Sequence, residues 1–526
     1  MVFKTRKFIV YFILIISAAQ IITPVHPVLA AEKPVTIVTY LTWYPAFATL
    51  NGCNSWASDG FGHKSSAKKG GVRNYPYPPR NQQEKHPLEN FNPKTPREAF
   101  ADASILSKIQ SMLDQEMDDI KKAGFDMIAI DILPIPPEAT NLVKEFCGIN
   151  AVKHLGERAK LKGIRSVILS DVMNRSGDYP NGRVMTATEW EHIYQDMIQH
   201  AQNWDWYWKK GGKYPVILQF AAGEGSIMEG GTRLNGMQAI RRWYEIKERL
   251  DAKNIKGMYF LDFRSNTIPA LIANNDDNIG GFVFAPGAPQ GLVNLLTSKI
   301  KNSAHDTIWT VSPGYYNQNH KAFFAPDFSR IHKAYMEAIN NNINKILFIT
   351  WNDFREDTDM APSLNKGDAL VNLLAYYNEW FKTKNQPVRE KSILVFALPL
   401  RKPKIIISHP PAWAQGNGKD YNEDQTHQKV YFWIYTPYRS KTNLYFNGSA
   451  VEKPTLATCT DHRGCITIDS FDLDGYTSGE IVLERINEKG EKFVSEKKGG
   501  SVTSVHEELQ RTGAGGLEYR YHALEK

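Results

Sequence analysis

Several kinds of functional site are absent from this sequence. Only four of its 526 residues are cysteines, and no histidine or cysteine cluster has metal-ligand spacing, so we expect no metal and no other cofactor. The glycine-rich stretch 222–233 lacks the Gly-Lys-Ser/Thr ending of a phosphate-binding loop. No Gly-x-Ser-x-Gly elbow, internal repeat, heptad or nucleic-acid motif occurs. These absences argue against a P-loop enzyme, a serine esterase and a nucleic-acid partner.

Long apolar runs are confined to the N-terminus. Beyond it no segment has eighteen consecutive apolar residues, so we expect no later membrane span. Lys4, Arg6 and Lys7 precede an apolar run at 8–19, and small residues lead up to Ala30, which is the pattern of a signal peptide over residues 1–30. We expect cleavage near Ala30, a secreted or periplasmic mature chain and no stable membrane anchor. An uncleaved anchor is the alternative, although no cysteine follows the cleavage site to carry a lipid.

The four cysteines suit an exported chain, because an even number can pair. Cys459 and Cys465 flank a short, turn-rich segment, and we predict a disulfide between them. Cys53 and Cys147 are candidates for a second bridge, but a sequence does not show whether two Cα atoms lie close enough to be bridged.

Length and composition indicate a globular protein of two domains. Charged residues make up 23% and hydrophobic residues 42%, which is ordinary for a chain that buries a core. The chain is longer than one ordinary domain, and a division into about 350 and about 120 residues is natural. The net charge of +7 is small for this size and gives little support to an anionic partner. We expect a monomer.

The region 31–381 alternates short apolar, β-branched runs with helix-like segments. Eight strands that alternate with helices predict an α/β fold of the (β/α)8 TIM-barrel type. A long loop at 48–100 follows the first strand, and we expect it to form part of the cleft. The predicted strands are 35–41, 127–132, 166–170, 215–220, 257–261, 281–284, 307–311 and 345–350. The predicted helices are 104–123, 139–162, 187–208, 234–252, 290–302, 327–341 and 366–380.

The pattern changes after residue 381. Residues 382–392 are polar and indicate a linker. Residues 393–498 contain strand-like runs separated by Gly, Asn and Asp turns, with no helical period, which is typical of an all-β sandwich. The remaining residues, 499–526, are rich in Gly and Glu, and we expect a disordered tail there.

Carboxylates and aromatic rings gather at the predicted strand ends. Because a TIM barrel places its chemistry at the carboxyl ends of its strands, we expect these side chains to share one mouth. Rings stack on pyranose faces and carboxylates move protons, so the combination predicts a carbohydrate site. The predicted substrate-binding residues are Trp43, Tyr44, Asp131, Glu224, Asp262, Tyr315, Tyr316, Trp351 and Asn352, and the predicted catalytic residues are Asp171, Asp353 and Glu356.

The strongest candidates are Asp353 and Glu356, three residues apart just past the eighth strand. Glycosidic cleavage generally uses two carboxyl groups, one protonated and one ionised, and close placement pushes their pKa values apart. The alternative is a helix N-terminus in which Asn352 or Asp353 caps the helix and Glu356 completes a capping box. Their position at a strand end, directly after Trp351 and Asn352, favours the functional interpretation.

Three other acids have structural alternatives. Asp131 precedes Ile-Leu-Pro and could cap a turn. Glu224 lies between glycines and could be exposed and inert. Asp262 has Arg264 two residues on and could serve only as its ion-pair partner. The aromatic pair at 43–44 is as compatible with a core as with a sugar platform.

The chain from about 35 to 381 resembles glycoside hydrolase family 71, the α-1,3-glucanases or mutanases. Four segments match that family in order: KKAGFDMIAIDI at 121–132, VILSDVM at 167–173, VSPGYYNQNHKAFF at 311–324 and FITWNDFRED at 348–357. The last, similar to the family's Thr-Trp-Asn-Asp-Tyr-Gly-Glu motif, is the most specific. Family 99, the endo-α-mannanases and endo-α-mannosidases, also carries a Trp-Asn-acid-x-x-Glu motif after its last strand.

The resemblance implies an inverting endo-hydrolase with Asp353 and Glu356 as its catalytic carboxylates and Asp171 lining the subsite. This sequence departs from the family 71 pattern at Arg355, where the family has Gly, and at 357–358, where it has Ser-His. An extra cation beside the acid pair alters pKa values or recognises a charged sugar.

We therefore expect an exported endo-acting glycoside hydrolase that cleaves an α-linked polysaccharide, with α-1,3-glucan as the first candidate. An endo-α-mannanase-type hydrolase is the alternative within enzymes. A non-catalytic carbohydrate-binding surface protein on a degenerate barrel is the alternative outside them, but such a protein would be free to lose Asp353 and Glu356, and both are present.

Overall fold

A computed structural model of the chain describes part of its 526 residues. Residues 1–34 and residues 35–526 form separate units, and every helix and strand within the described residues belongs to the second. The described residues are 32–42, 103–135, 148–172, 184–274, 276–317, 322–324, 328–353, 358–362, 368–399, 429–451, 457–460, 462–472, 478–495, 498–501 and 519–525.

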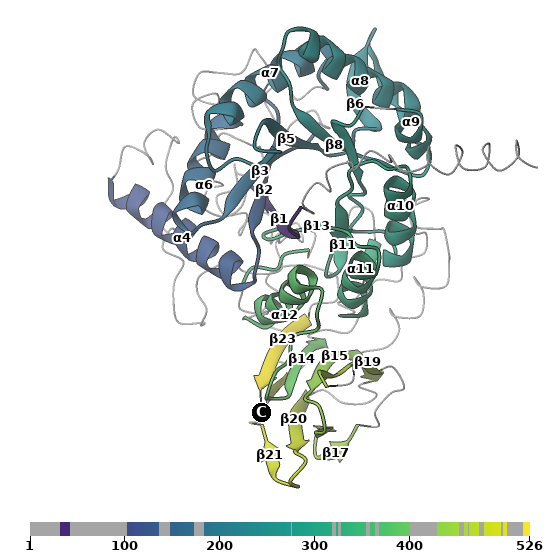
Figure 1. Ribbon diagram of the computed structural model, residues 1–526. Helices are drawn as coiled ribbons and strands as arrows, with labels where there is room; N and C mark the ends of the chain where they lie inside the picture. Colours follow the sequence, from purple (N-terminus) through teal and green to yellow (C-terminus); the bar gives the residue numbers. More distant parts are fainter. Residues whose placement is uncertain are drawn as a thin grey trace, which may run out of the picture. The chain divides into compact units, whose positions relative to one another are not determined.

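A ring of parallel strands forms the centre of the first half of the second unit (Figure 1). Within the described residues, eight strands pair in the order β10-β13-β1-β2-β3-β5-β8-β9, each neighbour parallel. Almost every residue of these strands is buried, which explains their continuous apolar sequences. The strands are β1 (Val35–Leu41), β2 (Met127–Ile132), β3 (Arg165–Ser170), β5 (Tyr214–Gln219), β8 (Met258–Asp262), β9 (Ile279–Phe282), β10 (Trp309–Val311) and β13 (Lys345–Phe348).

The ring closes between β9 and the segment that leads into β10. Gly281 forms a parallel bridge with Thr307. Its N–H donates to the carbonyl of Asp306 at 2.9 Å, and the N–H of Ile308 donates to the carbonyl of Gly281 at 3.1 Å. The predicted (β/α)8 TIM barrel is therefore confirmed.

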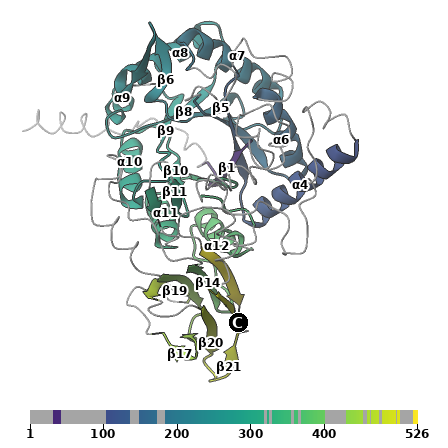
Figure 2. The same ribbon diagram turned by 180° about the vertical axis from the view of Figure 1, so that it is seen from behind.

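Helices surround the strand ring in both views (Figures 1 and 2). Each barrel strand is followed in the chain by one of them, which is the arrangement that right-handed crossovers produce. They are α4 (Ala103–Lys122), α6 (Ile149–Leu161), α7 (Ala187–Asn203), α8 (Gly236–Ala252), α9 (Ile268–Ile272), α10 (Gln290–Asn302), α11 (Phe328–Asn340) and α12 (Ala369–Thr383).

Polar contacts show which strand residues face the helices. The hydroxyl of Tyr40 on β1 donates to Glu116 on α4. The hydroxyl of Tyr194 on α7 donates to Gln219 on β5 at 2.7 Å. Because side chains alternate along a strand, the residues next to Tyr40 and Gln219 point into the barrel.

The structure adds short elements that the sequence pattern did not predict. The stretch 222–233, expected as a loop, includes most of an antiparallel hairpin of β6 (Glu224–Glu229) and β7 (Thr232–Asn235). Its turn residues Gly230 and Gly231 have φ of 55° and 80°, the left-handed pair that a tight hairpin turn needs. A second small hairpin joins β11 (Tyr315–Asn317) and β12 (Ala322–Phe324), and the two-residue strand β4 (Lys209–Lys210) pairs with β5.

The C-terminal part forms two antiparallel sheets, as predicted. One has the order β18-β19-β15-β14-β23, and the other contains β17-β16-β20-β21 with β22 beside β20. A separate core of ten buried residues includes Phe396, Phe432 and Leu483. The strands are β14 (Ile393–Pro399), β15 (Lys429–Thr436), β16 (Lys441–Phe446), β17 (Ser449–Ala450), β18 (Ala457–Thr460), β19 (Gly464–Asp472), β20 (Ser478–Ile486), β21 (Lys492–Val494), β22 (Lys498–Ser501) and β23 (Tyr519–Glu525).

Strand β15 is buried on both faces. Phe432 belongs to the core between the sheets, whereas Tyr431, Trp433 and Tyr435 belong to the large core shared with the barrel. The indole N–H of Trp433 donates to the hydroxyl of Tyr377 on α12 at 2.9 Å. The two-sided burial explains why KVYFWIYT is apolar without interruption.

The predicted linker 382–392 is fixed to both neighbours. The backbone N–H of Arg389 donates to the hydroxyl of Tyr435 at 2.9 Å. The hydroxyl of Tyr376 donates to the carbonyl of Pro387 at 3.2 Å, and Gln386 is 4% exposed. The segment joins the barrel and the sandwich as a packed connection instead of a free hinge.

The end of the chain differs from expectation. Within the predicted disordered tail 499–526, residues 519–525 form β23, which pairs with β14 from Tyr519–Pro399 to Glu525–Ile393. The glycines that precede it favoured disorder, whereas the sequence YRYHALE at 519–525 alternates as a strand does. The remaining residues of the tail lie mostly outside the described part.

Cys465 is disulfide-bonded in the structure. Cys459 lies directly opposite it in the β18–β19 pair, a register that suits the predicted bridge. Cys53 and Cys147 lie outside the described residues. None of the helices in the part of the chain that the structure describes combines the length and the apolar character needed to cross a membrane.

Candidate active site

Asp131 lies near the carboxyl end of β2 and points into the barrel. Its register partners are Leu41 on β1 and Leu169 on β3. Because Tyr40, one residue before Leu41, faces α4, alternation turns Leu41 and Asp131 inward. Asp131 is 6% exposed, and its Oδ1 has no hydrogen-bond partner within the described residues.

Two further carboxylates follow barrel strands. Asp171 comes directly after β3, where its backbone N–H donates to the carbonyl of Ile132 at 2.9 Å and its Oδ1 accepts from the N–H of Val172 at 2.6 Å. Asp353 comes shortly after β13, and its N–H donates to Oγ1 of Thr350 at 3.0 Å. Backbone contacts thus fix both acids where their strands end.

Both of these acids act on Asp131. Burial raises the pKa of Asp131 well above its ordinary range, and the charges of Asp171 and Asp353 raise it further. Because the repulsion between two charges weakens with distance, Asp171 and Asp353 lie near Asp131. The structure therefore brings together three of the predicted site residues, from β2, β3 and the segment after β13.

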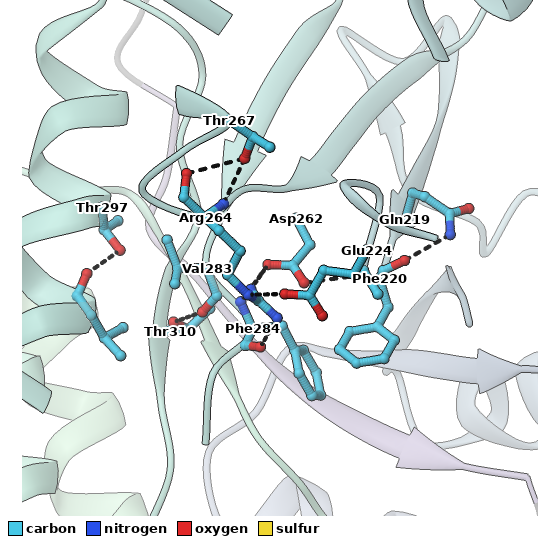
Figure 3. A network of polar contacts seen from close by, with 12 residues as sticks. Gln219, Phe220, Glu224, Asp262, Arg264, Thr267, Val283, Phe284, Thr297 and Thr310 are labelled. Carbon is cyan, nitrogen blue, oxygen red and sulfur yellow. Dashed lines mark hydrogen bonds and ion pairs between the residues drawn. The ribbon is translucent and has the colours of Figure 1, made fainter. Parts of the chain in front are cut away.

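A different set of charges surrounds Arg264, which follows β8 (Figure 3). Its guanidinium donates to Glu224 Oε1 at 2.7 Å, to Asp262 Oδ1 and to the carbonyl of Phe284, the last at 3.0 Å. Its backbone N–H donates to Thr267 Oγ1 at 2.8 Å. The coulombic pull of Asp262 and Glu224 outweighs burial and raises the pKa of Arg264. Glu224 is accordingly an ion-pair partner with a half-exposed side chain.

Asp262 connects three neighbouring strand ends. Its Oδ2 accepts from the N–H of Ala221, just after β5, at 3.0 Å, and its Oδ1 accepts from the N–H of Phe284, just after β9, at 2.8 Å. Burial raises its pKa from 3.8 to about 6, although Arg264 and the two N–H donors oppose this. These bonds make Asp262 a structural clamp on this side of the mouth.

Asn352 is a second clamp. Its Oδ1 accepts from the N–H of Leu41 at 2.8 Å, and its Nδ2 donates to the carbonyl of Leu41 at 3.0 Å. The side chain is fully buried. Both amide atoms therefore bind the end of β1, which favours a positioning role over the predicted contact with substrate.

Trp351 is also completely buried, at 0% exposure. Its backbone N–H donates to the carbonyl of Thr39 at 2.7 Å, and its carbonyl accepts from Met360 and Ala361. The ring packs in the main core, so no face is open for stacking in this structure. Its indole N–H has no hydrogen-bond partner within the described residues.

The other predicted aromatic residues are less informative. Tyr315 begins β11 and is 6% exposed. Tyr316 follows it on the same strand, and its side chain lies outside the described part. Trp43, Tyr44 and Glu356 lie outside the described residues altogether.

Two structural details near this site and behind β1 did not follow from the sequence patterns. Thr350 holds the backbone of Asp353, and its hydroxyl also bonds the hydroxyl of Thr358 at 2.9 Å. Burial raises the pKa of Glu116 on α4 to about 8, with Asp119 adding to the effect. A buried acid on the inner face of a helix is a signal visible in the sequence, whereas the threonine contact depends on the fold. No group of three His, Cys, Asp or Glu side chains within the described residues is arranged to hold a metal ion.

Comparison with protein-family models finds no match. Among curated proteins, the chain is 30% identical over 142 residues to the peptide deformylase of Neisseria gonorrhoeae, covering 27% of this chain and 80% of that protein. An alignment of this length is shorter than the barrel alone. The likeness is therefore local and gives no family for the whole chain.

Several solved barrels can be superposed on this chain. The GH99 endo-alpha-mannosidase of Bacteroides thetaiotaomicron gives a TM-score of 0.43 at 12% identity, covering 66% of this chain and 97% of that one. A tri-modular GH5 endo-beta-1,4-glucanase from Bacillus licheniformis gives 0.35 at 10% identity, covering 72% of each chain. The D-psicose 3-epimerase of Clostridium cellulolyticum H10 gives 0.30 at 11% identity, covering 52% and 92%. Superpositions with scores this low carry no functional conclusion.

Proposed function

We propose that this protein is a glycoside hydrolase that cuts within an α-linked polysaccharide, with α-1,3-glucan as its first candidate substrate. The observation that carries the proposal is the grouping of Asp131 near the carboxyl end of β2 with Asp171 and Asp353, which follow β3 and β13. Glycosidic cleavage needs one carboxyl group that holds a proton and one that is ionised, and mutual repulsion in a buried cluster produces that division. The α-1,3-glucan preference comes from the sequence resemblance to family 71.

In the proposed mechanism, Glu356 is the general acid and Asp353 is the general base or a partner of the hydroxyl beside the scissile bond. The assignment follows sequence position: Glu356 comes three residues after Asp353, so the proposal gives it the task of protonating the leaving oxygen. Inversion requires the acid and base carboxyl groups to lie roughly 6.5–9.5 Å apart. If Asp353 and Glu356 are closer than this, Asp171 takes the base role from across the cleft.

Substrate choice is tested by measuring reducing ends released from insoluble α-1,3-glucan, yeast mannan and dextran. Release from α-1,3-glucan is expected. Release from mannan alone would instead favour the endo-α-mannanase alternative. Binding to one glycan without release from any would contradict the enzymatic proposal and support a carbohydrate-binding surface protein.

Export is also part of the proposal. The basic and apolar pattern of residues 1–30 supports a cleaved signal peptide. Mass spectrometry of the protein recovered outside the cytoplasm should give an N-terminus at Ala31. An intact N-terminus in the membrane fraction would contradict cleavage.

A further inference from the structure

Asp131 differs from the other described acids at the barrel mouth in the hydrogen bonding of its carboxyl group. The backbone N–H and the hydroxyl of Thr42 both donate to its backbone carbonyl, at 3.3 and 3.0 Å. These bonds hold the residue in place without using its carboxyl group. Its Oδ1 is buried and has no hydrogen-bond partner in the part of the chain that the structure describes.

An ionised group in this position would be costly. A buried polar atom without a partner loses roughly 1–3 kcal/mol of hydration, and an ionised carboxylate loses more. Among the described residues, the charged groups that act on Asp131 are Asp171 after β3 and Asp353 after β13, and both repel a negative charge. On the β1 side its neighbours Leu41 and Thr42 do not titrate. The neutral acid, which carries an O–H donor, is the favoured form.

We propose that Asp131 stays protonated at neutral pH and contacts the substrate directly, donating a hydrogen bond from its carboxyl O–H to an oxygen of the bound sugar. This inference rests on the proposed glycoside hydrolase function. A carboxylic acid kept neutral by its surroundings can act as a donor without giving up its proton. The proton transfers remain with the acids assigned above.

Neutral Asp131 also lessens the repulsion within the cluster. With its carboxyl group uncharged, Asp171 and Asp353 meet one fewer repelling charge. Specificity follows as well, since a site that donates a hydrogen bond selects against a sugar that lacks the matching oxygen.

The test uses two substitutions of similar size in the full-length protein. Asp131→Leu removes the donor and should lower kcat/KM on the order of 10-fold to 100-fold, mainly through KM. Asp131→Asn restores a neutral donor and should recover most of that loss without moving the pH profile. An Asn variant as poor as the Leu variant would overturn the inference, and so would a Leu variant with wild-type KM.

A second measurement does not depend on activity. The infrared difference between wild type and Asp131→Asn at pH 7 should contain the carbonyl stretch of a neutral carboxylic acid. Its absence would overturn the inference even if the enzyme is active. A wild-type protein that cleaves none of the glycans while showing this band would contradict the proposed function and leave the protonation state established.

Discussion

The two sides of the barrel mouth surround their carboxylates with different groups: a cation and N–H donors on one side, and other acids on the other. On the side of β5, β8 and β9, Asp262 is held by Arg264 and by two backbone N–H groups. On the side of β2, β3 and β13, the charged groups that act on Asp131 within the described residues are the acids Asp171 and Asp353. A carboxylate that is fully bonded stabilises the fold but cannot easily move to a ligand. A carboxylate crowded by others is costly to the fold and suits chemistry.

The largest expected effect lies on the acid-rich side. Asp353→Asn should lower kcat on an unactivated polysaccharide by about 10²–10⁴-fold, the usual contribution of general acid–base catalysis. Glu356→Gln should do the same, but should recover on a substrate with a good leaving group, which needs no proton. Initial rates on both substrates check this.

Asp205→Asn is the matched control, because that carboxylate is 72% exposed and its ion pair is with a surface lysine, Lys160. It should leave the rate unchanged. If folded Asp353→Asn and Glu356→Gln both kept near-normal rates, the active site would lie elsewhere and the helix-cap interpretation of the motif would hold.

The next effect lies on the clamped side. Arg264→Met leaves the carboxylate of Asp262 buried without its cation, and breaking such a pair costs about 3–5 kcal/mol of unfolding free energy. Lys160→Met breaks an exposed, solvent-screened pair and should cost far less. Urea denaturation of both variants measures the difference. Equal losses would show that the Arg264 network does not hold this side of the barrel.

Asp262 also predicts a pH dependence of stability. Its pKa is raised from 3.8 to about 6 in the folded protein, so between these values the folded state binds more protons than the unfolded state. Stability should therefore fall as pH rises through this window, by about 3 kcal/mol at most, and level off above it. Asp262→Asn should flatten this slope in urea midpoints measured from pH 4 to pH 7. Identical slopes in the two proteins would refute the assignment.

The smallest effect concerns an uncharged hydrogen bond close to the ion pairs of Arg264. The hydroxyl of Thr310 on β10 donates to the carbonyl of Val283 at 2.6 Å (Figure 3). Thr310→Val keeps the shape and leaves that carbonyl without this donor, at a cost of about 1–2 kcal/mol. Thermal unfolding should show a loss smaller than that of Arg264→Met. A larger loss would mean that charge contributes little to the clamped side.

Local patterns predicted most of the fold, because each barrel strand is buried on both sides and each helix carries one apolar face. Strand 345–350 illustrates this, because its apolar run predicts a buried strand even when its partner strands are not known. The hairpin at Gly230 and Gly231 was missed because a glycine pair can serve a loop or a turn. Strand β23 was missed because its partner β14 lies far away in the chain.

The candidate site was predictable only in part. Strand-end position identified Asp131, Asp171 and Asp353 as neighbours in one mouth. The same rule also selected Asp262 and Asn352, whose roles are set by backbone groups on other strands. Strand order decides whether an acid lies beside a cation or beside another acid. A local sequence pattern does not contain the strand order.

The hydrogen bonds between Asn352 and Leu41 also bear on how the chain folds during its synthesis. The two residues are 311 positions apart, so the first strand of the barrel leaves the ribosome long before its second neighbour exists. Until then VTIVTYL, which has no charge and no proline, is an apolar segment with an open edge. An open apolar edge of this kind favours pairing with other chains. The risk of aggregation through this strand is therefore highest during synthesis, before residue 352 has been added.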